Sequence, residues 1–182
     1  MMRTGRWGAL WLMLTVVAAM TGAFNTVGVA VAAEPETLAT SAGAAVVLGA
    51  GPVTVTLAPP SGKALSARVA SVAPDRKVYL VAKGLGTDAP PETIYQLYLG
   101  LPPGTVPSPD SAYYVGALNF FNVVGRSAES DPRFLSFDVT SLLKSLHAQS
   151  ALAGNATVTI VPAGKPRANA KPVINAISLV AQ

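Results

Sequence analysis

VTVTL, residues 53–57, alternates apolar and polar side chains without a break. Successive side chains of an extended strand point to opposite sides, so the two valines and the leucine share one face and the threonines share the other. A period of two over five residues predicts a strand that is buried on one face only.

The same alternation recurs along most of the chain at short spacing. Runs rich in β-branched, aromatic or leucine residues, bounded by turn residues, are typical of strands in a sandwich or barrel. Most of the 15 prolines lie in the intervening segments, where a residue without an amide hydrogen breaks no ladder. The further predicted strands are LSARV (65–69), KVYLVAK (77–83), TIYQLYLGL (93–101), RFLSFDV (133–139), ATVTIV (156–161) and VINAISLV (173–180).

One segment departs from this pattern. TSLLKSLHAQSAL, residues 140–152, spaces its leucines as a helix does, with Thr140 as an N-cap and Gly154 as a stop. About eight strands with one short inserted helix predict an all-β fold, namely an antiparallel β-sandwich or a jelly-roll-like barrel.

The N-terminus has the three parts of an export signal. Arg3 and Arg6 make a positive start, an apolar run follows, and a small-x-small site over 30–32 precedes Glu34. We therefore expect a signal peptide over 1–33, a flexible leader over 34–45 and a single β-sandwich domain over 46–182. The protein is expected to be secreted, or to lie in the periplasm or cell envelope. It would be attached to a membrane only if the leader stays uncleaved.

Composition excludes several function classes. The chain of 182 residues has 13 basic and 9 acidic residues, and loss of the signal peptide leaves 11 basic residues and a net charge of +2. The basic residues are scattered apart from GKPRANAK (164–171), which argues against nucleic-acid binding. The chain has no cysteine, so disulfides and thiolate metal sites are excluded.

No group of residues composes an active site. His147, the one histidine, falls near the end of the predicted helix, where a capping or surface role explains it. The acidic residues fall mostly in turns, and Glu129 with Asp131 are too few for a calcium site. The sequence therefore predicts a protein that is not an enzyme, with no catalytic residue, no cofactor and no metal.

YYVGALNFFNVVG, residues 113–125, is uncharged and has apolar or aromatic residues on both faces of the expected strand. Such a strand is either central in the core or part of a contact surface. The general burial of aromatics favours the core. The alternative makes Tyr113, Tyr114, Phe120 and Phe121 partner-contact residues, with the two phenylalanines as the main anchors.

The order of segments resembles the C-terminal domain of tyrosinases and plant polyphenol oxidases. The resemblance runs over roughly 53–182 and rests on the strand and turn VYLVAKGLGTDAPPETIYQLYLGLPPG, then YYVGALNFFNVVG, FDVTSLLKSL, VTIVPAG and INAISLV. One departure stands at 95–98, where plant members have Lys-Phe-Asp-Val and this chain has Tyr-Gln-Leu-Tyr.

The resemblance implies a shielding domain without the oxidase, because the dicopper centre of that family needs six histidines. In such relatives the β domain packs over the copper entrance, keeps the enzyme latent and supplies one side chain as a plug. The expected partner is thus a separately encoded tyrosinase-like copper oxidase. Two alternatives stay open: a cell-envelope structural or interaction domain, and a small-molecule or carbohydrate-binding module.

Overall fold

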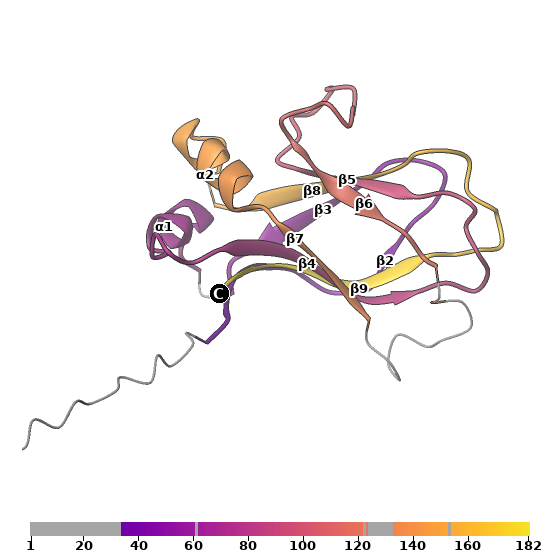
Figure 1. Ribbon diagram of the computed structural model, residues 1–182, viewed down its shortest axis with the longest axis horizontal. Coiled ribbons are helices and arrows are strands. Elements are labelled where there is room, and N and C mark those ends of the chain that lie inside the picture. The colour runs from indigo at the N-terminus through magenta and orange to yellow at the C-terminus, as the bar shows by residue number, and fades with distance from the viewer. Residues whose placement is uncertain (1–33, 61, 122, 124–132, 153) are drawn as a thin grey trace, which may run out of the picture. The chain divides into compact units, whose positions relative to one another are not determined.

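The fold is that of a computed structural model, which describes residues 34–60, 62–121, 123, 133–152 and 154–182 (Figure 1). The chain divides into two compact units, Met1–Ala32 and Ala33–Gln182, and the described residues all belong to the second. The predicted signal peptide over 1–33 lies outside the described residues.

The described residues form an all-β unit, as predicted. The strands pair antiparallel in one sheet, in the order β6-β5-β8-β3-β1-β9-β4-β7, with β2 paired to β9 beside this path. The strands of the described chain are β1 Glu36–Ser41, β2 Val46–Val47, β3 Val53–Ala58, β4 Val78–Gly86, β5 Tyr95–Leu99, β6 Tyr114–Leu118, β7 Phe134–Asp138, β8 Ala156–Pro162 and β9 Val173–Ala181.

The sheet is nearly closed into a barrel, because its two end strands, β6 and β7, come together. A Cβ atom built on Gly116 of β6 would lie 2.7 Å from Cδ1 and Cε1 of Phe137 on β7. The ring of Phe137 therefore packs directly on the backbone of β6. Only a residue without a side chain allows this approach at the seam.

The core confirms the period of two. In β3 the threonines are exposed while the valines are half-buried and Leu57 is fully buried. The central strand β4 is buried at nearly every position, since it pairs with β9 on one side and β7 on the other. The largest fully buried side chains are Tyr95, Tyr98, Leu38, Leu57, Leu65, Leu80, Leu97, Leu99, Leu118, Leu143, Leu146 and Ile160.

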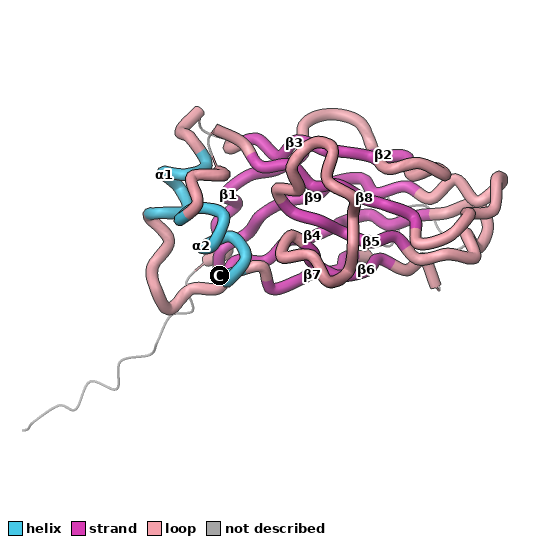
Figure 2. The backbone as a smooth tube through the Cα atoms, turned by 90° about the horizontal axis from the view of Figure 1, so that it is seen from above, coloured by secondary structure: helices cyan, strands magenta, loops and turns pink. Residues whose placement is uncertain are grey.

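Two helices of the described chain lie together at one end of the strands (Figure 2). Helix α2, Thr140–Ala148, is the predicted one, and it buries Leu143 and Leu146. Thr140 is its first residue rather than its N-cap. The backbone amide of Thr140 donates to Asp138 Oδ1 at 3.0 Å, and hydrogen bonds from Thr140 hold the pKa of Asp138 below its usual value.

The predicted strand over 65–69 is wrong, because Leu65–Ala70 is helix α1. Leu65 and Val69 are four residues apart, a spacing that puts them on one face of a helix and also on one face of a strand. In the structure Leu65 is fully buried and Val69 packs against the core. The alternation that suggested a strand is therefore also the pattern of a one-sided helix.

The flexible leader expected over 34–45 is also corrected. Residues Glu36–Ser41 form β1, which lies between β3 and β9. Leu38 and Ala39 are fully buried. The strand is tied to α1 by Arg68, which donates to Glu36 Oε1 at 2.9 Å and to the carbonyl of Thr37 at 2.8 Å. In the described part of the chain no helix is long and apolar enough to cross a membrane.

Tyr95 and Tyr98 on β5 offer a matched test of buried hydroxyl groups. Tyr95 is 1% exposed and its hydroxyl has no hydrogen-bond partner among the described residues, so burial raises its pKa. We expect Tyr95→Phe to raise the free energy of unfolding by about 1 kcal/mol, because a buried unpaired polar group costs about 1–3 kcal/mol. Urea unfolding followed by circular dichroism measures the difference.

The control is Tyr98→Phe. The Tyr98 hydroxyl, equally buried, donates to Gln96 Oε1 at 2.8 Å. Its removal should lower the free energy of unfolding by about 1 kcal/mol, the net value of a typical hydrogen bond. If both changes lowered the free energy of unfolding equally, the Tyr95 hydroxyl would not be an unpaired buried group.

Candidate functional site

The uncharged stretch 113–125 provides both a strand and a surface. Its first part forms β6, and Tyr113 and Tyr114 are half-buried. Tyr113 packs against the core, and the ring of Tyr114 meets that of Tyr98 edge-on with centroids 5.6 Å apart. Both tyrosines therefore support the barrel wall and leave only part of their surface for contact.

The two phenylalanines of this stretch differ sharply. Phe120 is 2% exposed, and its ring meets Tyr95 nearly at right angles with centroids 5.8 Å apart. Phe121 is 84% exposed. Phe120 is thus a core residue, which corrects its place among the expected contact residues. Phe121 is the aromatic of the pair that a partner can reach.

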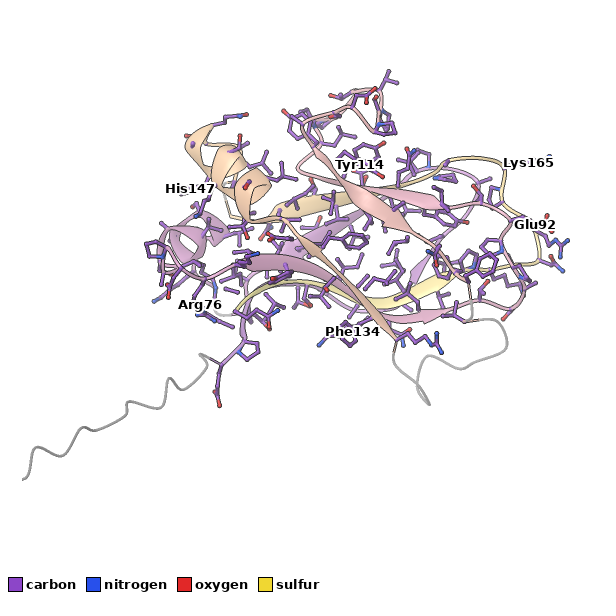
Figure 3. The ribbon with its side chains drawn as sticks, in the orientation of Figure 1. Arg76, Glu92, Tyr114, Phe134, His147 and Lys165 are labelled. Carbon is purple, nitrogen blue, oxygen red and sulfur yellow. The ribbon has the colours of Figure 1, made fainter. Side chains whose placement is uncertain are left out.

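Phe121 shares an open pocket with a second exposed aromatic, Phe134, which is 63% exposed. Phe134 is the first residue of β7 (Figure 3). The pocket has a volume of about 520 Å³. We call these seven lining residues the Phe121 surface: Leu85, Asn119, Phe121, Val123, Arg133, Phe134 and Leu135.

Sequence reasoning missed Phe134, although a signal was present. In RFLSFDV, alternation puts Leu135, Phe137 and Val139 on one face of the strand, so Phe134 belongs to the opposite face. Phe134 therefore adds a second exposed aromatic ring to the pocket that Phe121 lines.

Two basic residues, Lys83 and Arg133, lie at the Phe121 surface in the part of the chain that the structure describes. Lys83 of β4 is exposed and is the ladder partner of Phe134, so the two side chains stand on the same face. The carbonyl of Arg133 accepts from the amide of Gly84 at 2.8 Å, which fixes the position where the chain enters β7. The ion pair of Arg167 with Glu92, at 2.5 Å, joins the connection before β9 to the connection before β5.

The described residues show no arrangement for metal chemistry: among them no three histidine, cysteine, aspartate or glutamate side chains gather. His147 is in the last turn of α2, where the sequence predicted it, and is partly exposed (Figure 3). Among the described residues, the Phe121 surface offers apolar contact area beside the basic residues Lys83 and Arg133.

Solved structures of plant polyphenol oxidases are among those that this chain is similar to. Latent apple tyrosinase is 17% identical with a TM-score of 0.49, over 76% of this chain and 27% of the tyrosinase. Recombinantly expressed latent aurone synthase, a polyphenol oxidase, is 15% identical with a TM-score of 0.47, over 74% of this chain and 25% of the synthase. This chain thus spans about a quarter of their length.

No curated protein matches the chain. A family model described as "Domain of unknown function (DUF7868)" matches residues 34–182, a range that includes every strand from β1 to β9. The chain therefore belongs to the DUF7868 family.

Proposed function

We propose that the chain is an exported, non-catalytic β domain that binds a tyrosinase-like copper oxidase and lowers its activity. The class of the proposed partner is inferred from the order of the motifs over 53–182, which resembles the C-terminal domain of tyrosinases. Export is supported by the positive start, apolar run and small-x-small site before Glu34. The family model's start at residue 34 fits a domain that begins there.

The observation that carries the proposal is the exposure of Phe121. Phe121 and Phe134, which are 84% and 63% exposed, line one pocket, and aromatic residues are enriched where protein surfaces meet. Phe120 is packed in the core and holds the backbone that presents Phe121. The anchor is therefore preorganised, which lowers the conformational entropy lost on binding.

The proposed mechanism is steric. A rigid barrel that covers a concave active-site entrance excludes phenols without touching the copper chemistry. A separate domain does not have the effective concentration of a fused one, which is on the order of millimolar for a short flexible linker. Its affinity must come from a few desolvated anchor side chains, and Phe121 with Phe134 form the exposed aromatic pair that can supply it.

We expect Phe121→Ala to weaken binding to a cognate tyrosinase catalytic domain by about 2 kcal/mol or more, roughly 30-fold. The experiment titrates residues 34–182 against the catalytic domain and follows both binding and diphenol oxidation. Half-maximal inhibition should move to higher concentration by the same factor as the dissociation constant.

Val106→Ala is the matched control. Val106 is also 84% exposed but lies in the connection between β5 and β6, away from the residues of the Phe121 surface. Its removal should leave inhibition unchanged. If the unaltered domain neither binds nor inhibits the catalytic domain at tens of micromolar, the proposed partner is wrong. The alternative of a cell-envelope structural or interaction domain is then favoured. If Phe121→Ala and Val106→Ala weaken binding equally, the proposed partner is retained, but Phe121 is not the anchor of the contact.

A further inference from the structure

One edge of β3 has no strand beside it over most of its length. On one side β3 pairs with β8 from Val53 to Leu57, whereas on the other side it pairs with β1 only at Leu57 and Ala58. No other backbone hydrogen bond of the described chain reaches residues 53–56. Because a strand directs amide and carbonyl groups to both sides, β3 keeps such groups without a described backbone partner on its β1 side. We call residues 53–56 on that side the β3 edge.

The segments around β3 leave this edge open. Strand β1 stops at Ser41, and residues 42–45, which would continue the ladder opposite β3, are exposed and form no strand. Gly43 turns the chain there with a φ of +90°. Cβ atoms built on Gly43, Gly49 or Gly51 would have no described atom within 4 Å, so the connections before β2 and before β3 are not packed at these positions. Another chain can therefore approach the β3 edge.

The β3 edge lacks the features that protect most open edges from pairing. Natural sheets protect such an edge with charged side chains, with proline, with a bulge or with a covering segment. Strand β3 contains no charged residue and no proline, and its pairing with β8 has no shift of register. The sequence has no charged residue between Glu36 and Lys63. A second strand would therefore meet no charge repulsion from this part of the chain.

We propose that the β3 edge pairs antiparallel with the same edge of a second copy of this chain, across a two-fold axis. Two-fold dimers are the commonest homo-oligomers, and they require a surface that is complementary to itself. A two-fold axis brings like charges together wherever the surface is charged, so an uncharged edge meets this requirement. The sheets of the two copies would then join through their β3 strands.

The side-chain pattern of β3 is also complementary to itself. In its existing pairing with β8, Thr54 lies opposite Thr159 and Val55 lies opposite Val158. The hydroxyls of the two threonines are 3.3 Å apart. A second β3 has the same alternation, so a register centred on Thr54 or on Val55 keeps threonine opposite threonine and valine opposite valine. Matched pairs of this kind stabilise neighbouring strands.

The first test is the oligomeric state of residues 34–182, measured by sedimentation equilibrium without any partner protein. The contact is short, so we expect a reversible dimer with a dissociation constant on the order of 100 μM, as suits a small and transient interface. The average mass should rise towards twice the monomer mass over about 10 μM to 1 mM. A protein that stays monomeric over this range overturns the proposal, and an extended peptide of another protein is then favoured as the occupant of the edge.

Charge exchange tests whether the β3 edge makes the contact. Thr54 and Thr56 are exposed, so new side chains at these positions leave the inner face of β3 unchanged. Thr54→Lys combined with Thr56→Lys should weaken dimerisation about tenfold or more, because both registers set lysines against one another and like charges across an interface repel. Thr54→Glu combined with Thr56→Glu should weaken it to a similar extent. An equimolar mixture of the two variants should dimerise again.

A single introduced cysteine reports the register, because the chain has no cysteine of its own. Opposed residues of an antiparallel pair have Cα atoms about 4.5–5.5 Å apart, a distance that a disulfide spans. Thr54→Cys should form a covalent dimer by itself if the register centres on Thr54, and only together with Thr56→Cys if it centres on Val55. Ser136→Cys, at an exposed position of β7, is the matched control and should crosslink at least about tenfold more slowly.

Three results would show that the β3 edge is not the contact between the copies. The first is a dimer that persists unchanged in both charge variants. The second is a mixture of the charge variants that stays monomeric although each variant keeps the circular dichroism spectrum of the parent. The third is crosslinking of Ser136→Cys as fast as that of the cysteine variants of β3.

Discussion

Replacing Phe120 by alanine is expected to lower the free energy of unfolding by about 3–5 kcal/mol, the range for a phenylalanine deleted from a core. The ring is 2% exposed and meets the ring of Tyr95 edge-on, so the change removes buried area and leaves a cavity beside the Tyr95 side chain. Urea unfolding followed by far-ultraviolet circular dichroism measures the loss.

The matched variant is its neighbour. Phe121→Ala removes the same side chain at a position that is 84% exposed, and the free energy of unfolding should change by less than about 0.5 kcal/mol. The pair therefore separates stability from binding on two consecutive residues. A loss below 1 kcal/mol for Phe120→Ala would place the Phe120 ring outside the core and reverse the assignment of the two phenylalanines.

Gly84→Ala is expected to lower the free energy of unfolding by about 2–6 kcal/mol, from two additive causes. Gly84 lies inside β4 at φ +66°, a left-handed conformation that costs a residue with a side chain about 1–3 kcal/mol. A Cβ there would also lie 2.6 Å from Nδ2 and 2.7 Å from Cβ of Asn175, and overpacking of this kind costs about 1–3 kcal/mol.

The control for this change is Gly49→Ala. No atom lies within 4 Å of a Cβ atom built on Gly49, so the variant should unfold at nearly the same urea concentration as the parent. To divide the two causes at Gly84, the Asn175→Gly change is added to Gly84→Ala. That double variant relieves the contact and keeps the backbone strain. Its loss of unfolding free energy should therefore be smaller than the sum of the losses of the two single variants. Full stability of Gly84→Ala would disprove both causes.

The strands were predictable because their pattern is local. VTVTL and the runs like it carry their burial pattern within five to seven residues, and the structure confirms them as β3, β4, β5, β7, β8 and β9. The segment over 65–69 was ambiguous for a physical reason, since Leu65 and Val69 satisfy both a period of two and a spacing of four. Only the packing of both residues against the core as a helix decides it.

What depends on distant partners was not predictable. Strand β1 is short and small in side chains, and its place is set by β3 and by β9, which lies at the other end of the sequence. For the candidate site, alternation put Phe120 and Phe121 on opposite faces. Which face is the inner one depends on the register of β6 against β5, and that register shifts between Leu97 and Tyr98. The contribution of Phe134 to the Phe121 surface could not be predicted, because it depends on the start of β7 meeting the end of β6.

The pairing of β1 with β9 determines when the sheet can be completed during synthesis of the chain. The Thr40 hydroxyl lies 2.9 Å from that of Ser178, a contact between residues 138 positions apart in the chain. The ribosome makes β1 early, and β1 cannot pair with β9, one of its two neighbours, until that nine-residue strand has been synthesised. Contacts of such wide sequence separation make folding slow, because a long loop must close before they form. The pairing of β1 is thus completed only when β9 has been made. Because β9 lies between β1 and β4, a chain that lacks β9 has lost the strand that joins the two halves of its sheet.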